Sequence, residues 1–152
     1  MFRIVIAAAL CLAPTFGGAA TPDVKGLWLT EKKGIIVDLY ECDGGLCGRT
    51  VWLKKMFNKD GTPRLDVNNP DEALHNRHWC GIEVIRNVRP DGDGTWDDGE
   101  VYDPKTGQTF DFEIKKKGDY LKVRGYLGVK LLGKSEIWTR TDAEGVTLCP
   151  TS

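Results

Sequence analysis

The sequence has few of the features that most enzyme and membrane classes require. It contains only two serines, Ser135 and Ser152, and no G-x-S-x-G motif, which excludes a nucleophile of the α/β-hydrolase type. The 21 basic residues nearly balance the 22 acidic ones, and no basic stripe suits the chain to nucleic acid. The longest apolar run, residues 4–13, is too short to cross a bilayer as a helix, so the chain is not expected to span a membrane.

The first twenty residues have the composition of an export signal. Arg3 precedes the apolar run, and a proline and four small residues follow it. This order is typical of a secretory signal peptide, with cleavage expected after Ala20. We therefore predict a signal peptide over residues 1–20, a single domain over residues 21–152, and a periplasmic or secreted location. A buried N-terminal helix is the alternative, which the proline disfavours.

Four cysteines follow the predicted signal peptide: Cys42, Cys47, Cys80 and Cys149. An even number in an exported chain favours two disulfides, and the C-x4-C spacing fits a zinc site poorly. Four cysteines allow three pairings. We predict Cys42–Cys47, because these two residues flank a short hairpin loop, and Cys80–Cys149 by elimination.

Alternating apolar and polar residues between glycine-rich turns dominate the chain from residue 25 onward. They predict eight short strands, over residues 26–30, 35–42, 46–53, 81–88, 95–102, 108–115, 120–127 and 135–141. Because tight turns join most of them, neighbouring strands are expected to pair antiparallel. The predicted fold is all-β: an eight-stranded antiparallel up-and-down barrel, which leaves no exposed edge. A two-sheet sandwich is the competing arrangement, but it needs longer crossovers.

Residues 54–78 interrupt this pattern and are expected to form a long loop between the third and fourth strands. Asn69, Pro70 and Glu72 have the spacing of a capping box, so a short helix is predicted over residues 70–77. We expect the loop to lie over one opening of the barrel, either above a ligand or as a structural plug. The residues expected to form this cover are the polar Asn58, Arg64, Asp66, Asn68, Asn69, Arg77 and His78, and the apolar Met56, Phe57, Leu65, Leu74 and Trp79.

The first and last predicted strands carry complementary residues. A G-x-W motif ending at Trp28 opens the series, and Arg140 closes it. In a closed barrel these strands are neighbours, so Arg140 is predicted to stack on the Trp28 ring. This pairing of motifs at opposite ends of eight strands resembles the lipocalin and calycin barrels.

The whole predicted domain resembles the bacterial domain-of-unknown-function family 2147. The segments that carry the resemblance are residues 26–28, 40–49, 51–53, 66–70, 80–81, 99–104, 107, 123–128 and 138–140. The resemblance implies a secreted or periplasmic protein with a lipocalin-like barrel, and it implies no reaction.

Two clusters invite comparison with metal sites. Glu72, His75 and His78 recur every third residue, but on a helix such side chains spread over about 120° instead of converging. Asp91 and Asp93 begin a calcium-loop pattern that the following residues interrupt. Neither cluster predicts a bound metal, and no cofactor is expected.

The sequence favours a binding protein over an enzyme. An eight-stranded barrel is just wide enough for its own side chains or for one small ligand. The leading hypothesis is a small amphipathic or apolar molecule held in or at the mouth of the barrel. The predicted ligand contacts are Trp79, Arg77, Asn68, Asn69 and Asp66.

Two other functions remain open at this point. The five tryptophans, Trp28, Trp52, Trp79, Trp96 and Trp138, could instead fill the lumen. The protein would then be an envelope structural or interaction module without a ligand. An enzyme of unknown reaction is the third possibility.

Overall fold

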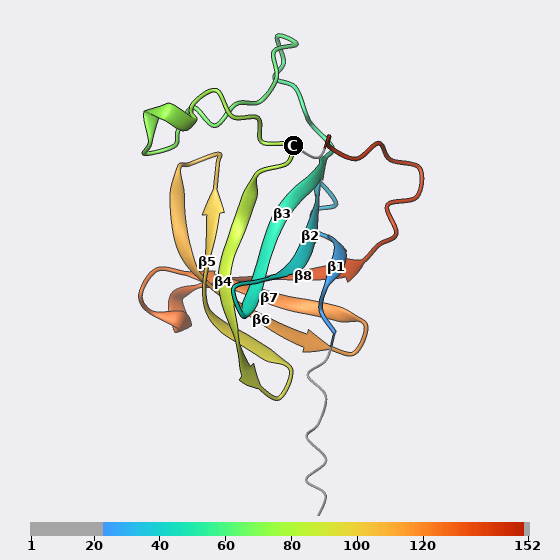
Figure 1. The fold of residues 1–152 in the computed structure, drawn as a ribbon, viewed down its shortest axis with the longest axis vertical. Helices are drawn as coiled ribbons and strands as arrows, with labels where there is room; N and C mark the ends of the chain where they lie inside the picture. Colours follow the sequence, from blue (N-terminus) through green and yellow to red (C-terminus); the bar gives the residue numbers. More distant parts are fainter. Residues whose placement is uncertain (1–22, 151–152) are drawn as a thin grey trace, which may run out of the picture.

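The structure, a computed structural model, describes residues 23–150, so the predicted signal peptide lies outside the described residues. Its eight strands form one closed antiparallel barrel, in which each strand pairs with the next and β8 returns to β1 (Figure 1). The strands are β1 (Gly26–Leu29), β2 (Ile35–Cys42), β3 (Gly45–Leu53), β4 (Glu83–Gly92), β5 (Thr95–Asp103), β6 (Gln108–Lys117), β7 (Tyr120–Tyr126) and β8 (Lys134–Arg140). The up-and-down barrel predicted from the alternation is confirmed, and the sandwich is wrong.

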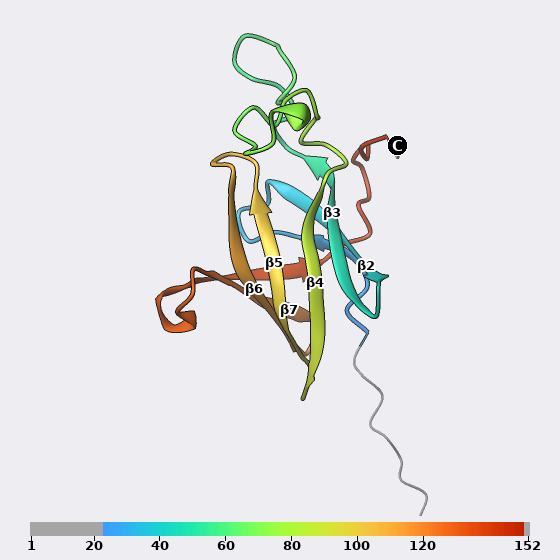
Figure 2. The same cartoon turned by 60° about the vertical axis from the view of Figure 1, so that its left-hand side comes forward.

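The two ends of the barrel are built differently. At one end, tight turns join β2 to β3, β4 to β5 and β6 to β7. In the first of these, Asp43 and Gly44 have φ values of 40° and 75°, a conformation that Asp and Gly tolerate. The other end carries the connection from β3 to β4, residues 54–82, which rises above the strands (Figures 1 and 2). We call residues 54–82 the lid.

The barrel closes around a fully buried tryptophan near the tight-turn end. Trp28 is opposite Arg140 in the β1–β8 pair, and the Arg140 guanidinium lies 4.2 Å from the centre of the Trp28 ring. Lys116 approaches the same ring at 5.3 Å. Gly26 has a φ of +105°, and a Cβ there would lie 2.8 Å from the Arg140 side chain. The motif therefore needs glycine two residues before the tryptophan, so that the arginine can reach the ring.

The apolar core extends along the lumen from the tight-turn end to residues below the lid, among them Val37 and Val84. Trp28, Trp96 and Trp138 are all buried, and they belong to one continuous apolar cluster. The Phe112 and Trp138 rings lie 6.1 Å apart, centre to centre, in a tilted arrangement. Three of the five tryptophans therefore fill the lumen.

The predicted helix over residues 70–77 is wrong. Only η1, a 3-10 helix at Glu72–Leu74, is present, and its N-cap is Asp71. Asn69 does not cap it, because its side chain bonds to Asp66 and to the Asp71 N–H. The short helix has no buried residue, so no apolar face favours its extension.

Two connections outside the barrel also matter for the surface. The β7–β8 connection, residues 127–133, has the length expected from the predicted strands and contains η2 (Lys130–Leu132). The C-terminal segment runs back along the outside of the barrel toward the lid (Figure 1). Cys149 in this segment bonds to Cys80, and Cys42 bonds to Cys47 across the β2–β3 hairpin. Both predicted disulfide pairs are present in the structure.

Candidate ligand site beneath the lid

A buried carboxylate anchors the lid to the rim of the barrel. Asp66 is fully buried, and it accepts hydrogen bonds from Tyr102 on β5 (2.5 Å), Arg77 (2.6 Å) and Asn69 (2.8 Å). A buried charge destabilises a fold unless it is paired in this way. Burial and the bond to Asp66 raise the pKa of Tyr102 to about 12. The tyrosine therefore stays protonated and continues to donate at neutral pH.

The lid also rests directly on the β5–β6 turn. The Asn68 amide donates to the Lys105 carbonyl at 2.8 Å. Gly107 in this turn has a φ of +73°, and a Cβ there would lie 1.9 Å from the Asn68 carbonyl oxygen. The two backbones are thus so close that only glycine fits at position 107.

The far end of the lid is tied to β3. The Thr50 hydroxyl donates to the Trp79 carbonyl at 2.5 Å, and the Gly81 N–H donates to the Thr50 carbonyl at 2.8 Å. The Cys80–Cys149 disulfide joins the same stretch to the C-terminal segment. The lid is therefore held at its middle and at its C-terminal end, and Trp79 is fixed in position.

The tip of the lid stands away from the barrel. Asn58 N–H donates to the Thr62 carbonyl, and Arg64 N–H donates to the Met56 carbonyl, which makes a small self-contained hairpin. Figure 2 shows this hairpin projecting above the strands. Phe57 is 58 % exposed, so the expectation that it packs down over the opening is wrong. Its hairpin satisfies its own backbone hydrogen bonds and does not need the barrel.

A cavity of about 360 Å³ lies between the lid and the filled part of the lumen. This volume is within the range of small-molecule sites, roughly 300–1,000 Å³. Its wall is mostly apolar, and a few polar side chains stand at its rim. The lining residues are Thr30, Ile35, Val37, Thr50, Leu53, Arg64, Trp79, Val84, Val101, Tyr102, Asp103, Pro104, Lys105, Glu136 and Trp138.

Two of the lining residues, both in the lid, carry buried hydrogen-bond donors without a partner among residues 23–150. The Arg64 guanidinium lies 5.0 Å from the centre of the Trp79 ring. Arg64 Nε and Trp79 Nε1 are both buried, and neither has an acceptor among residues 23–150. Buried donors are rarely left unpaired, because each costs about 1–3 kcal/mol. The pair is therefore suited to an acceptor group from outside the protein.

Arg64 differs in this respect from two other arginines with an unpaired Nε. Arg49 and Arg77 each bind a carboxylate through another nitrogen, on Asp38 and Asp66 respectively. No ion pair or side-chain hydrogen bond of Arg64 is found in the described part of the chain. The β8 wall adds one carboxylate, Glu136, which accepts from Trp138 Nε1 at 3.3 Å.

The ligand contacts predicted from sequence lie in three places. Trp79 lines the cavity, whereas Asp66, Asn69 and Arg77 converge in the anchor of the lid. Asn68 binds the β5–β6 turn. Asn69 and Arg77 face a separate depression of about 200 Å³. Sequence reasoning missed Tyr102 and Glu136 as lining residues, because their strands gave no sign of which residues approach the lid.

The histidines of the lid do not gather around a common point with Glu72. His75 Nε2 lies 2.8 Å from the Asn69 carbonyl, and His78 forms a backbone bridge with Leu65. Within residues 23–150 there is no group of three or more His, Cys, Asp or Glu side chains arranged to hold a metal ion. The same residues include no helix long and apolar enough to cross a membrane.

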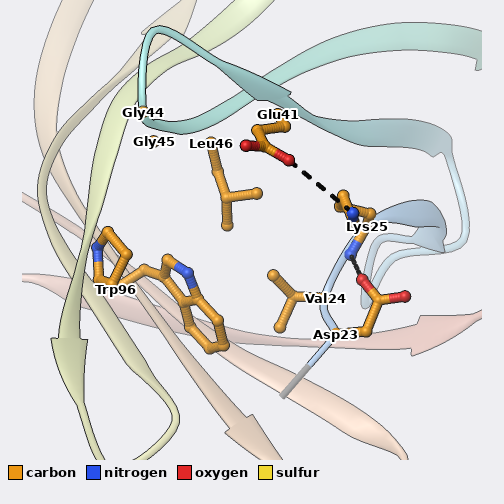
Figure 3. Close-up of a pocket in the computed structure, with 9 residues that line it drawn as sticks. Asp23, Val24, Lys25, Glu41, Gly44, Gly45, Leu46 and Trp96 are labelled. Carbon is orange, nitrogen blue, oxygen red and sulfur yellow. Dashed lines mark hydrogen bonds and ion pairs between the residues drawn. The ribbon is translucent and has the colours of Figure 1, made fainter. Parts of the chain in front are cut away.

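A second depression, of about 460 Å³, lies at the tight-turn end of the barrel. Figure 3 shows Val24, Leu46 and Trp96 pointing into it, with Lys25 and Glu41 at its edge. The Lys25 ammonium lies 3.9 Å from the Glu41 carboxylate, so these charges compensate each other. No unpaired buried donor of the described residues lines this depression, which makes it a poorer site for a polar ligand than the lid cavity.

The fold and the sequence both have counterparts among known proteins. A bacterial family described as "Uncharacterized protein conserved in bacteria (DUF2147)" matches residues 26–140. No curated protein matches the chain. The chain is similar to a solved structure titled "Protein HP1028 from the human pathogen Helicobacter pylori belongs to the lipocalin family". The two share 19 % identity with a TM-score of 0.72, over 86 % of this chain and 92 % of that chain, a likeness that shows the lipocalin fold.

Proposed function

The chain belongs to the DUF2147 family of uncharacterised bacterial proteins, and on that premise we propose that it is an exported, non-enzymatic protein that binds one small amphipathic molecule beneath the lid. The observation that carries the proposal is the pair of unsatisfied donors, Arg64 Nε and Trp79 Nε1, beside an apolar cavity. A few convergent polar groups at the mouth of an apolar pocket are the usual form of a small-ligand site.

The residues that line the cavity are the basis for the ligand chemistry that we propose. Its apolar part would lie against Val37, Val84 and Val101, and an acceptor group would face Arg64 and Trp79. A carboxylate or sulfonate suits this position, since a charge-assisted bond to arginine is stronger than a neutral one. A volume of about 360 Å³ admits a molecule of roughly 15–20 non-hydrogen atoms at the packing density of proteins.

Binding without catalysis is supported by where the reactive side chains lie. All four cysteines of the described chain are in disulfides, and Ser135 bonds to Arg124 away from the cavity. Export is supported by the composition of residues 1–20 and by the two disulfides, which persist in oxidising compartments. We propose residues 21–152 as the mature domain.

Two probes with one skeleton test the proposal. 1-Anilinonaphthalene-8-sulfonate carries an anionic group, whereas N-phenyl-1-naphthylamine lacks it. Wild-type protein is expected to enhance the fluorescence of both. Arg64→Met should weaken sulfonate binding at least tenfold, the equivalent of about 1.4 kcal/mol, and change binding of the neutral probe less than about twofold.

Filling the cavity separates specific binding from adsorption to the surface. Val101→Trp places extra volume in the cavity wall and should abolish binding of both probes. Thr139→Trp, at an exposed position on β8, adds the same side chain away from the cavity and should leave binding unchanged. Equal loss of both probes in Arg64→Met, or full binding in Val101→Trp, would place the ligand elsewhere. Native mass spectrometry of protein purified from its own cells would then look for a retained molecule of the stated size.

A further inference from the structure

The connection from β7 to β8 exposes an unusual amount of apolar surface. Residues 127–133, here called the docking loop, project from the side of the barrel (Figures 1 and 2). Its exposed aliphatic side chains are Leu127 (63 %), Val129 (54 %), Leu131 (85 %) and Leu132 (80 %). Single exposed apolar residues are ordinary, but a contiguous group on a soluble protein marks an interaction site.

The docking loop is held in this conformation by its neighbours. Arg124 on β7 donates to the carbonyls of Lys130 (2.8 Å) and Leu131 (2.9 Å) and to the Ser135 hydroxyl (2.8 Å). The Gly128 N–H donates to Asp111 at 3.0 Å. The exposed leucines therefore lie on a hydrogen-bonded loop, and their exposure does not result from a lack of local structure.

Lys130 anchors the loop to the outer wall of the barrel. Its ammonium group binds both Asp97 and the buried carboxylate of Glu113, and these bonds raise the pKa of Lys130. Glu113 also binds Lys115 at 3.1 Å. Asp97 and Glu113 are thus paired with lysines, whereas Asp111, which accepts from the Gly128 N–H, has no ion pair within the described residues.

Two exposed lysines lie beside the loop. Lys122 on β7 and Lys134 at the start of β8 are exposed, and neither has an ion pair within the described residues. The surface therefore combines a projecting aliphatic tip with unpaired positive charges next to it. This combination is complementary to an anionic lipid surface, where apolar groups enter the acyl boundary and lysines bind the phosphates.

We propose that the docking loop places the protein on an anionic phospholipid bilayer. The tip is convex, whereas a stable protein interface buries a broad face of about 800 Å² on each partner. The proposal rests on different residues from the ligand site and does not depend on it.

Vesicle binding tests this proposal directly. Wild-type protein is expected to co-sediment with vesicles of phosphatidylcholine and phosphatidylglycerol at 7:3, and far less with phosphatidylcholine alone. The double variant L131Q/L132Q should bind the mixed vesicles at least tenfold more weakly. F57Q/V67Q, at two exposed apolar residues of the lid, is the matched control and should bind like wild type.

The charge requirement has its own variant. K122Q/K134Q should lose the preference for phosphatidylglycerol, and wild-type binding should weaken as salt is raised. All substituted side chains are exposed, so melting temperatures should be unchanged. Absence of vesicle binding by wild type would overturn the proposal, as would equal binding by L131Q/L132Q. Self-association in light scattering that L131Q/L132Q abolishes would assign the surface to a second copy and overturn it as well.

Discussion

Replacing Arg140 with alanine should destabilise the protein far more than an ordinary surface substitution. The arginine lies over the Trp28 ring, and it donates to the carbonyls of Lys25 and Asp23, the segment that leads into β1. It therefore joins the first strand, the last strand and the N-terminal segment at the closure of the barrel. Its removal also uncovers one face of a tryptophan that is otherwise fully buried.

The magnitude follows from these contacts. A cation–π contact at a partly exposed site contributes about 0.5–1 kcal/mol. A hydrogen bond from a charged donor adds about 1.5 kcal/mol, and the longer bond to Asp23 (3.4 Å) adds less. The expected loss is about 2–3 kcal/mol in the free energy of unfolding. For a domain of this size that corresponds to a fall of roughly 6–15 °C in melting temperature.

Urea unfolding followed by tryptophan fluorescence, together with thermal unfolding by circular dichroism, measures this loss. Arg86→Ala is the matched control, because Arg86 makes a single ion pair with Glu83 on the exposed face of β4. Such a pair contributes less than about 1 kcal/mol. If Arg140→Ala and Arg86→Ala lower the midpoint equally, the closure argument is refuted.

Three further predictions concern the disulfides, the lid and the pH dependence. Removing the Cys80–Cys149 bond should lower the free energy of unfolding by about 4 kcal/mol, and removing Cys42–Cys47 should lower it by about 2 kcal/mol, because the first bond closes a much longer loop. Urea unfolding measures both losses. A Cys47–Cys80 peptide in a non-reduced digest would contradict the pairing. Gly107→Ala should displace the lid, because the added Cβ would meet the Asn68 carbonyl. Proteolysis within residues 57–63 should become faster, and probe binding should become weaker. An unchanged cleavage rate would show that the contact with Asn68 can relax. The pKa of Tyr102 is raised to about 12, so its contribution to stability is complete below about pH 10 and is lost as the pH rises through 12. The pKa of Tyr40 is also raised to about 12, so absorbance at 295 nm should show more than one late-titrating tyrosinate, and Tyr102→Phe should remove one of them. No difference between the two titrations would contradict the bond to Asp66.

The strand pattern is the part of this protein that local sequence determines. In a strand the side-chain period is two, so each alternating segment specifies which face is buried, and the Asp43-Gly44 turn sets the register of its hairpin. The stacking of Arg140 on Trp28 also follows, because closing eight antiparallel strands brings the first beside the last. The pairing of Cys42 with Cys47 is local, because the two residues flank the β2–β3 hairpin.

The connections depend on contacts that sequence patterns do not encode. The alternation in β7 continues into Leu127, yet the strand ends at Tyr126 and the docking loop turns outward, held by Arg124 and Lys130. Asn69 has the spacing of a helix cap, but its side chain is used by Asp66. In both segments a polar side chain bonds to a partner that outweighs the local preference: Glu113 on β6 for Lys130, and Asp66 within the lid for Asn69.

The ligand site depends on the same kind of competition between two arginines of the lid. Arg64 and Arg77 lie in the same long loop, and their sequence neighbours do not indicate which of them is paired. In the folded lid, the buried carboxylate of Asp66 pairs with Arg77, and Arg64 Nε beside Trp79 has no partner among the described residues. Asp66 itself is fixed by Tyr102, 36 residues away on β5. Local sequence therefore determined the barrel, whereas contacts between residues far apart in the chain decided which polar groups remain free at its mouth.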